Sequence, residues 1–151
     1  MAGPLIREPR RSDDRSEMTA GCSEKSAQQL EILVVEDEPA VQEMTRLLLE
    51  QEGHSVTCFS NGLEAVAHIQ EHPFRYDGVV LDVIIPGMKG SDVLHCIRDI
   101  NPDISVLVCS GFAPDGTLVK LLKTEHVRFL QKPYEADALL SKVRTFLPSN
   151  S

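Results

Sequence analysis

The stretch Gly-Val-Val-Leu-Asp at residues 78–82 decides the fold of this chain. Its uninterrupted apolar run is typical of a strand that is buried on both faces, as strands are in a parallel sheet with helices on either side. The run ends in Asp82, and ligands bind such sheets at the edge formed by the carboxyl ends of the strands. Residues 78–82 therefore predict a central strand that presents a carboxylate at this edge.

Outward from this strand, apolar runs alternate with amphipathic patterns along the chain. We expect four further strands, at residues 32–35, 54–59, 104–109 and 127–130, and five helices, at residues 39–52, 61–72, 91–100, 118–123 and 135–147. Helical spacing assigns inward faces to Val41, Met44, Leu47 and Leu48 in the first helix and to Leu63, Val66 and Ile69 in the second. Strict alternation predicts an α/β fold, a doubly wound parallel sheet with helices on both faces.

Charge is distributed unevenly along the chain. Residues 1–29 carry five basic and five acidic side chains, so the rest of the chain holds the whole formal net charge of −8. We interpret residues 1–29 as a disordered tail or linker, residues 30–148 as one domain and residues 149–151 as a C-terminal tail. An acidic domain without a basic stripe argues against direct nucleic-acid binding and favours a cation or a basic protein as partner.

The sequence also predicts where the protein resides. No apolar run approaches the roughly 20 residues that span a bilayer, and the first residues lack the apolar core of a signal peptide. The four cysteines, Cys22, Cys58, Cys96 and Cys109, form no CxxC pair. We therefore expect a cytoplasmic protein with reduced thiols and no membrane segment. Nucleotide binding is disfavoured because neither GxxxxGK[ST] nor GxGxxG occurs.

Polar residues stand at the end of the predicted strands. Glu36-Asp37, Asp82, Ser110 and Lys132 each end or directly follow an apolar run, so a parallel sheet would bring them to one edge. Carboxylates are ligands that Mg²⁺ prefers, and a lysine or a hydroxyl can hold phosphoryl oxygens. The pattern predicts a magnesium-dependent site that accepts a phosphoryl group.

Four stretches at these strand ends resemble a known family. ILVVEDEP, YDGVVLDVIIPGMKG, VLVCSG and FLQKPY match, in this order and spacing, the receiver domain of bacterial two-component response regulators. The resemblance covers residues 30–147 and implies a flavodoxin-like sheet of order 2-1-3-4-5 with five helices. It implies a phosphoprotein of signal transduction, not a turnover enzyme, whose partner is a sensor histidine kinase or a phosphotransfer protein.

The resemblance also implies a role for each site residue. Asp82 would be the phosphoacceptor, and Mg²⁺ would be bound by Glu36, Asp37, Asp82 and the backbone carbonyl of Ile84. Glu36 stands where many members have Asp, and its extra methylene allows a water-mediated contact. Lys132 would hold a phosphoryl oxygen. Both Mg²⁺ and Lys132 would offset the repulsion between the carboxylate and the incoming phosphoryl group.

Ser110 and Phe129 would form the switch. In this scheme the Ser110 hydroxyl binds a phosphoryl oxygen, and its movement lets the Phe129 ring turn inward. The surface that changes would comprise the fourth helix, the fifth strand and the fifth helix, where we expect partner binding or homodimerisation. The resemblance favours a cis peptide at Lys132-Pro133, although for most X-Pro bonds the trans form is favoured.

Ile84 and Phe112 each lie two residues past a site residue, and neither side chain can orient an attacking water. We therefore expect slow self-hydrolysis of the acyl phosphate. Ile84 also disfavours a phosphatase of the aspartyl-nucleophile type, which needs a second acidic residue at that position.

Two alternatives stay open at this point. A receiver-like module could bind its partner without being phosphorylated. The receiver could also stand alone or be the C-terminal receiver of a hybrid histidine kinase, whose receivers the SGF and FLQKPY stretches resemble.

Overall fold

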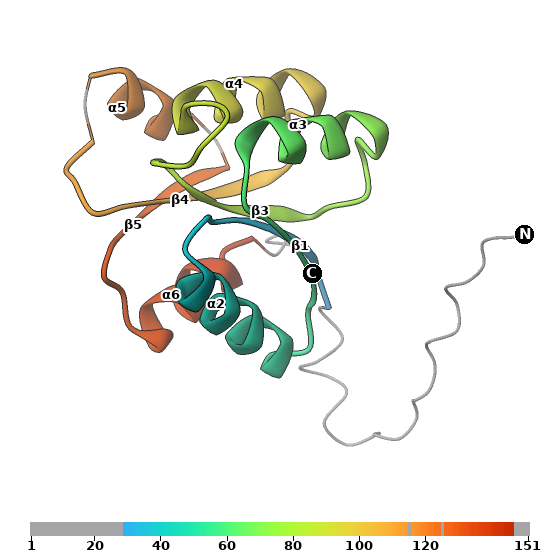
Figure 1. Ribbon diagram of the computed structural model, residues 1–151, viewed down its shortest axis with the longest axis vertical. Helices are drawn as coiled ribbons and strands as arrows, with labels where there is room; N and C mark the ends of the chain where they lie inside the picture. Colours follow the sequence, from blue (N-terminus) through green and yellow to red (C-terminus); the bar gives the residue numbers. More distant parts are fainter. Residues whose placement is uncertain (1–28, 115, 125, 147–151) are drawn as a thin grey trace, which may run out of the picture.

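The computed structural model describes residues 29–114, 116–124 and 126–146 (Figure 1). The strands are β1 (Glu31–Val35), β2 (Ser55–Phe59), β3 (Gly78–Asp82), β4 (Ser105–Ser110) and β5 (Val127–Gln131). The helices are α2 (Pro39–Gln51), α3 (Gly62–Glu71), α4 (Gly90–Ile100), α5 (Gly116–Leu122) and α6 (Ala136–Arg144). The predicted tails, 1–29 and 149–151, lie outside the described residues except for residue 29.

The five strands form one parallel sheet of order β2-β1-β3-β4-β5, which confirms the predicted doubly wound topology. Figure 1 shows α3, α4 and α5 on one face of the sheet and α2 and α6 on the other. Alternate residues of each central strand point to opposite faces. Each face therefore has its own apolar core, and β1 and β3 are buried on both sides, as their uninterrupted apolar runs predict.

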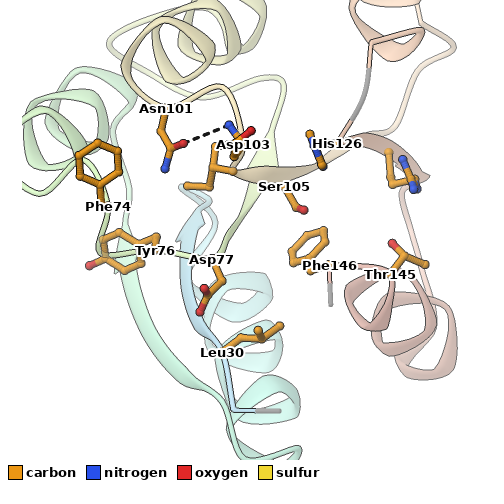
Figure 2. A pocket seen from close by; sticks show the side chains of 12 residues that line it. Leu30, Phe74, Tyr76, Asp77, Asn101, Asp103, Ser105, His126, Thr145 and Phe146 are labelled. Carbon is orange, nitrogen blue, oxygen red and sulfur yellow. Dashed lines mark hydrogen bonds between the residues drawn. The ribbon is translucent and has the colours of Figure 1, made fainter. Parts of the chain in front are cut away.

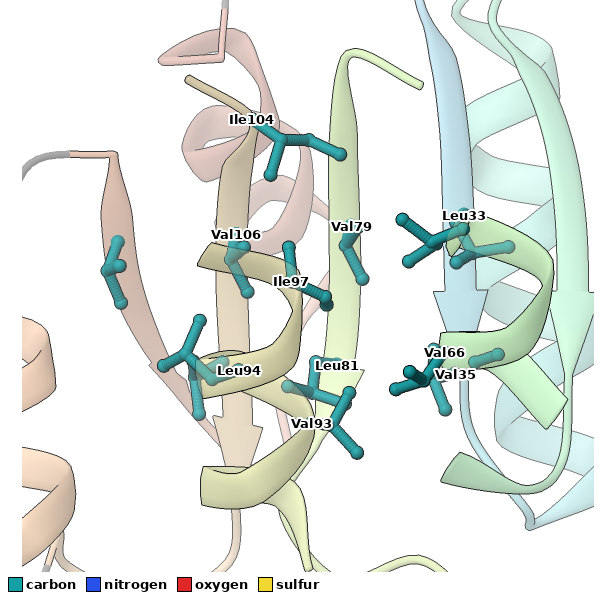
Figure 3. Packing of buried hydrophobic residues seen from close by; sticks show 14 of the residues in the cluster. Leu33, Val35, Val66, Val79, Leu81, Val93, Leu94, Ile97, Ile104 and Val106 are labelled. Atoms are coloured by element: carbon teal, nitrogen blue, oxygen red, sulfur yellow. The ribbon is translucent and has the colours of Figure 1, made fainter. Parts of the chain in front are cut away.

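The core on the α3–α5 side contains the residues drawn in Figure 3. Val93, Leu94 and Ile97 of α4 are fully buried there against residues of β1, β3 and β4. The inward face predicted for α4 from its helical spacing is therefore correct. For α3, Val66 and Ile69 are buried as predicted, but Leu63 is exposed.

Leu63 is exposed because of how α3 begins. The side-chain Oδ1 of Asn61 accepts hydrogen bonds from the backbone N–H groups of Leu63 (2.8 Å) and Glu64 (3.2 Å) and so caps the helix. Leu63 thus lies in the first turn, while Gly62, Ala65, Val66 and Ile69 form the buried face. The apolar spacing predicted the helix and two of its three inward residues correctly, and was wrong only for Leu63.

The inward face predicted for α2 is wrong in two positions. Met44 and Leu47 are 42% and 45% exposed, whereas Thr45 and Leu49 are buried. Thr45 points inward because its hydroxyl shares a hydrogen bond of 2.9 Å with the hydroxyl of Tyr134, which follows β5. A polar partner across the core rotates the buried stripe by about one residue from the face that apolar spacing alone predicts.

The two edges of the sheet differ in character. A cleft of about 550 Å³ lies at the amino-terminal ends of the strands, and Leu30, Asp77, Ser105, His126 and Phe146 are among its lining residues (Figure 2). The polar residues singled out from the sequence stand at the opposite, carboxyl-terminal ends.

Among the described residues, no helix combines the length and the apolar character needed to cross a bilayer.

Candidate functional site

Three carboxylates converge at the carboxyl ends of β1 and β3. Glu36 and Asp37 directly follow β1, and Asp82 is the last residue of the neighbouring strand β3. One carboxylate oxygen of each residue lies within 4.8 Å of the others. Glu36 and Asp82 are only 4% and 7% exposed, while Asp37 is exposed to solvent. A set of donors that are all carboxylate oxygens fits a hard divalent cation such as Mg²⁺.

Lys132 reaches this cluster from the end of β5. Its Nζ lies 3.0 Å from Oε1 of Glu36 and 3.1 Å from Oδ2 of Asp82. The peptide bond between Lys132 and Pro133 is cis, as the sequence resemblance implied. The backbone N–H of Lys132 donates to the carbonyl of Ser110 at 2.7 Å, so the ends of β4 and β5 are joined next to the carboxylates.

The electrostatics of the cluster are set by burial and by Lys132. Burial raises the pKa of Glu36 above its ordinary value of 4.5, although hydrogen bonds from the Glu38 N–H and from Lys132 act in the opposite direction. Burial alone would lower the pKa of Lys132, but its hydrogen bonds to Glu36 and Asp82 outweigh burial and raise that pKa. Lys132 is therefore a permanent positive charge beside two buried carboxylates.

Cys109 is the neighbour of Asp82 across the sheet. Burial raises the pKa of its thiol to about 12, and the charge of Asp82 acts in the same direction. The thiol is therefore neutral at physiological pH and is a poor nucleophile. Of these two neighbours, only Asp82 offers a charged nucleophilic atom.

Ser110 lies one residue beyond Cys109, at the same edge as the carboxylates. It is buried, and its Oγ accepts a hydrogen bond of 3.0 Å from the backbone N–H of Phe112. On the other side of Asp82, the backbone N–H of Ile84 donates to Oδ1 of Asp82 at 3.2 Å. The structure thus brings together the strand-end residues that the sequence singled out; their roles stay predictions.

Phe129 lies farther from the carboxylates than these residues, within β5. Its ring is partly buried and packs against the core on the α3–α5 side of the sheet. Two residues of the same strand separate it from Lys132. The ring is therefore placed between the site edge and the α5 face, which is compatible with the switch role predicted for it.

Sequence reasoning did not connect Gln42 or Asn61 with the site, although both contact the segments that carry it. Nε2 of Gln42 donates to the backbone carbonyl of Glu36 at 2.7 Å and to Oγ of Ser60 at 3.2 Å. Asn61 caps α3 and lies directly against Gly87, in the loop after β3. An asparagine at a helix start predicts only a helix cap, and a glutamine in a first helical turn is common for local reasons, so neither residue was linked to the site.

Comparison with known proteins gives a consistent result. A sequence model described as the response regulator receiver domain matches residues 32–144. Response regulator MprA of Mycobacterium sp. (strain KMS) is 34% identical over 120 residues, which are 80% of this chain and 51% of MprA. Sensor kinase CckA of Brucella abortus (strain 2308) is 31% identical over 148 residues, which are 95% of this chain and 16% of the kinase.

Solved structures with the same architecture include two receiver domains. The receiver domain from hybrid histidine kinase CckA is 30% identical, with a TM-score of 0.67, and the match covers 78% of this chain and 99% of that one. A CheY-like receiver domain protein from Methanospirillum hungatei JF-1 is 24% identical, with a TM-score of 0.71, over 78% of this chain and 93% of that one, and supports the fold alone. The chain spans about half the length of the curated regulators it matches.

Proposed function

The chain belongs to the response regulator receiver domain family, and from this premise we propose that it is a phosphoacceptor switch in which Asp82 takes a phosphoryl group from a phosphohistidine. Receiver domains of two-component systems are regulatory domains rather than turnover enzymes, and they act with histidine kinases or phosphotransfer proteins. The observation that carries the proposal is the contact of Lys132 Nζ with Asp82 at 3.1 Å, inside a cluster of three carboxylates.

The chemistry that we propose is the transfer of one phosphoryl group. A carboxylate oxygen of Asp82 forms a bond to phosphorus while the bond from phosphorus to the donor's imidazole nitrogen breaks. The imidazole nitrogen takes up a proton from solvent, and Asp82 becomes an acyl phosphate. Burial of Asp82 at 7% exposure supports this role, because it limits the access of water to the product.

Mg²⁺ fits the donor set described above. Glu36, Asp37, Asp82 and the backbone carbonyl of Ile84 would hold it, with Glu36 directly or through water. When bound, the ion would reduce the repulsion between the anionic nucleophile and the anionic phosphoryl group.

Lys132 and Ser110 would act on the phosphoryl oxygens. The ammonium of Lys132 already lies at hydrogen-bond distance from Asp82, so it needs little movement to contact an oxygen attached there. The Ser110 hydroxyl is buried at the same edge and bonds only to the Phe112 N–H among the hydrogen bonds described, so its proton can be donated to a phosphoryl oxygen.

The context of the domain is also part of the proposal. The 31% identity to sensor kinase CckA extends over 95% of this chain, beyond the receiver domain itself. This extent of similarity supports the interpretation of the chain as a receiver attached to, or derived from, a hybrid histidine kinase. A stand-alone receiver that passes the phosphoryl group to another protein is the alternative arrangement.

Treatment with acetyl phosphate or phosphoramidate and Mg²⁺ tests the chemistry. Intact-mass measurement is expected to show one added phosphoryl group on the full chain, because Asp82 ends β3 beside Lys132, at 3.1 Å, with an oxygen within 4.8 Å of those of Glu36 and Asp37. Asp82→Asn is expected to abolish the addition, because an amide is not a nucleophile at this position.

Asp99→Asn is the matched control, since Asp99 is an exposed aspartate on α4, away from the cluster. It should be phosphorylated like the unaltered chain. If the unaltered chain gained no phosphoryl group while remaining folded, the proposal would be wrong. Partner binding that is the same with and without phosphate donor would then favour an interaction module that acts without phosphorylation.

A further inference from the structure

The turn between β2 and α3, residues 59–62, contacts the segment that carries Glu36 and Asp37. The backbone N–H of Glu36 donates to the carbonyl of Phe59 at 3.0 Å. Gln42 adds a second link, because its Nε2 donates to the carbonyls of Glu36 (2.7 Å) and Phe59 (3.4 Å) and to Oγ of Ser60 (3.2 Å). The amide of Gln42 therefore ties the end of β1 to the end of β2.

The same turn contacts the loop after β3, which carries Ile84. The backbone N–H of Gly62 donates to the carbonyl of Pro86 at 2.9 Å. Gly87 has a φ of +92°, and a Cβ added there would lie 2.4 Å from Oδ1 and 2.7 Å from Cγ of Asn61. The backbone of Gly87 and the side chain of Asn61 are thus in direct contact, with no room for a methyl group between them.

The order of the strands shows that these two sets of contacts lie on either side of the end of β1. Because β1 lies between β2 and β3, a contact from the β2–α3 turn to the loop after β3 has to pass over the end of β1. Glu36 and Asp37 stand at that end. The turn therefore spans the two segments that would supply cation ligands, the acidic pair and the Ile84 loop, although it supplies no ligand itself.

We infer that residues 59–62 act as a brace that sets the separation of these two ligand segments, with Gln42 and Asn61 as positioning residues. This inference rests on the proposed function, since it concerns the cation of the same site. Mg²⁺ needs near-octahedral geometry at about 2.1 Å, so its affinity responds to small displacements of the Ile84 loop. Residues outside the ligand set commonly tune affinity in this way.

Two glycines of the chain provide a matched test. Gly53 has a φ of +97°, close to that of Gly87, but a Cβ added at Gly53 would meet no atom within 4 Å. Alanine at either position therefore carries the strain of a positive φ, and only alanine at Gly87 also pushes against Asn61. The difference between Gly87→Ala and Gly53→Ala isolates the effect of the brace.

Isothermal titration calorimetry of the full chain with MgCl₂ gives the readout without phosphorylation. Gly87→Ala is expected to raise the Mg²⁺ dissociation constant by about tenfold. Gly53→Ala is expected to bind as the unaltered chain does, within about twofold, although the strain of its positive φ lowers thermal stability.

A rescue variant separates displacement of the loop from general damage. Asn61→Gly removes the Asn61 atoms that an alanine at position 87 would overlap, and glycine is tolerated at a helix N-cap. In the double variant Asn61→Gly/Gly87→Ala, the dissociation constant is expected to lie within about twofold of that of Asn61→Gly alone.

The outcomes distinguish the two proposals. If the unaltered chain binds Mg²⁺ and the two alanine variants bind it equally well, or if the two losses simply add in the double variant, the brace is overturned while the proposed function stands. If the unaltered chain binds no Mg²⁺, the proposed metal site fails and the brace fails with it. A selective loss in Gly87→Ala, recovered in the double variant, supports the brace.

Discussion

At the scale of single residues, Lys132 brings a positive charge to two buried carboxylates of the site. Burial disfavours the charged form of Glu36, and the ammonium of Lys132, at 3.0 Å, partly offsets that cost. The same ammonium contacts Asp82 at 3.1 Å. One positive charge thus compensates two buried carboxylates and stays beside the atom that we propose as nucleophile.

Ile84 and Phe112 are the residues expected to flank the proposed acyl phosphate. Both flank the site, and they are 60% and 67% exposed. Neither offers a polar group, so we predict an acyl phosphate with a lifetime of hours rather than seconds. Ile84→Asn introduces an amide that can hold an attacking water and is expected to shorten this lifetime by about tenfold, below the 10²- to 10⁴-fold range of a general base.

The lifetime can be followed by intact mass after removal of the phosphate donor. Ile84→Leu is the control, because it keeps an apolar side chain at the same position. A lifetime of seconds in the unaltered chain, or equal lifetimes in the asparagine and leucine variants, would contradict the prediction.

At the scale of elements, one partly buried hydrogen bond joins α2 to the segment between β5 and α6. Thr45 is 1% exposed, and its hydroxyl lies 2.9 Å from the hydroxyl of Tyr134. Burial raises the pKa of Tyr134 to about 12, although the Thr45 hydrogen bond opposes this rise. The link holds α2 in the orientation that exposes Met44 and Leu47, and it starts two residues after Lys132.

Removing one partner of this hydrogen bond is predicted to cost more than removing both. Thr45→Val leaves the partly buried Tyr134 hydroxyl without this partner, so the free energy of unfolding should fall by about 1 kcal/mol. Thr45→Val/Tyr134→Phe should be less destabilised than the sum of the two single variants. Urea denaturation of the four proteins measures this coupling, and strict additivity would argue against the link.

His54 joins β1 and β2 where they start. Its Nδ1 accepts a hydrogen bond of 3.1 Å from the backbone N–H of Leu30, so that nitrogen carries no proton. Burial lowers the pKa of His54 below 6.5, although Glu52 and Asp77 act in the opposite direction. Below pH 6.5, His54 is therefore protonated more readily in the unfolded chain than in the folded chain.

The sign of the resulting pH dependence follows from linkage. The folding stability that comes from keeping His54 neutral is fully present above pH 6.5. It is lost as the pH falls through the lower pKa of folded His54. We predict that the melting temperature falls between pH 7 and pH 5.5, and that His54→Asn, which keeps an acceptor but does not titrate, makes this fall shallower.

Part of the fall should persist in His54→Asn, because burial also lowers the pKa of His68. His95→Asn serves as a control at an exposed position on α4. A slope that is the same in His54→Asn and in the unaltered chain would show that His54 does not contribute.

At the scale of the whole molecule, the proposed site and the cleft of Figure 2 occupy opposite edges of the sheet. A change at Asp82 can spread along the carboxyl edge because the Ser110 carbonyl accepts the Lys132 N–H at 2.7 Å. This bond connects β4 to β5, and α5 and α6 flank β5 in the chain. The proposed output surface is therefore α5, β5 and α6, reached through Phe129.

We predict that phosphorylation shifts the amide NMR resonances of α5, β5 and α6, with the largest changes near Ser110 and Phe129. Residues of the opposite cleft, such as Asn101 and Ser105, are the internal control and should change little. Sedimentation of the same samples tests whether this surface also forms a homodimer. Changes confined to the immediate neighbours of Asp82 would contradict the predicted output surface.

The sequence predicted much of this molecule because its strongest signals are local. Continuous apolar runs, the helical spacing of α4 and the polar residues at strand ends are properties of short segments. Their strict alternation predicts a parallel sheet, and the resemblance to the receiver family implied its strand order. The α2 face was predicted wrongly because Thr45 is buried by a partner 89 residues away, Tyr134. Local spacing cannot register a partner at that separation.

By itself, the sequence determined the parallel sheet and which residues stand at the strand ends, because hydrophobic periodicity and turn residues encode these features within a few positions. It indicated the family through four short motifs at the strand ends. Only the tertiary structure decided that Lys132 contacts both Glu36 and Asp82, and that Asn61 lies against Gly87. Such contacts join segments that are distant in the chain. They depend on how crossovers stack the strand ends together, which is a property of the packed molecule rather than of any one segment.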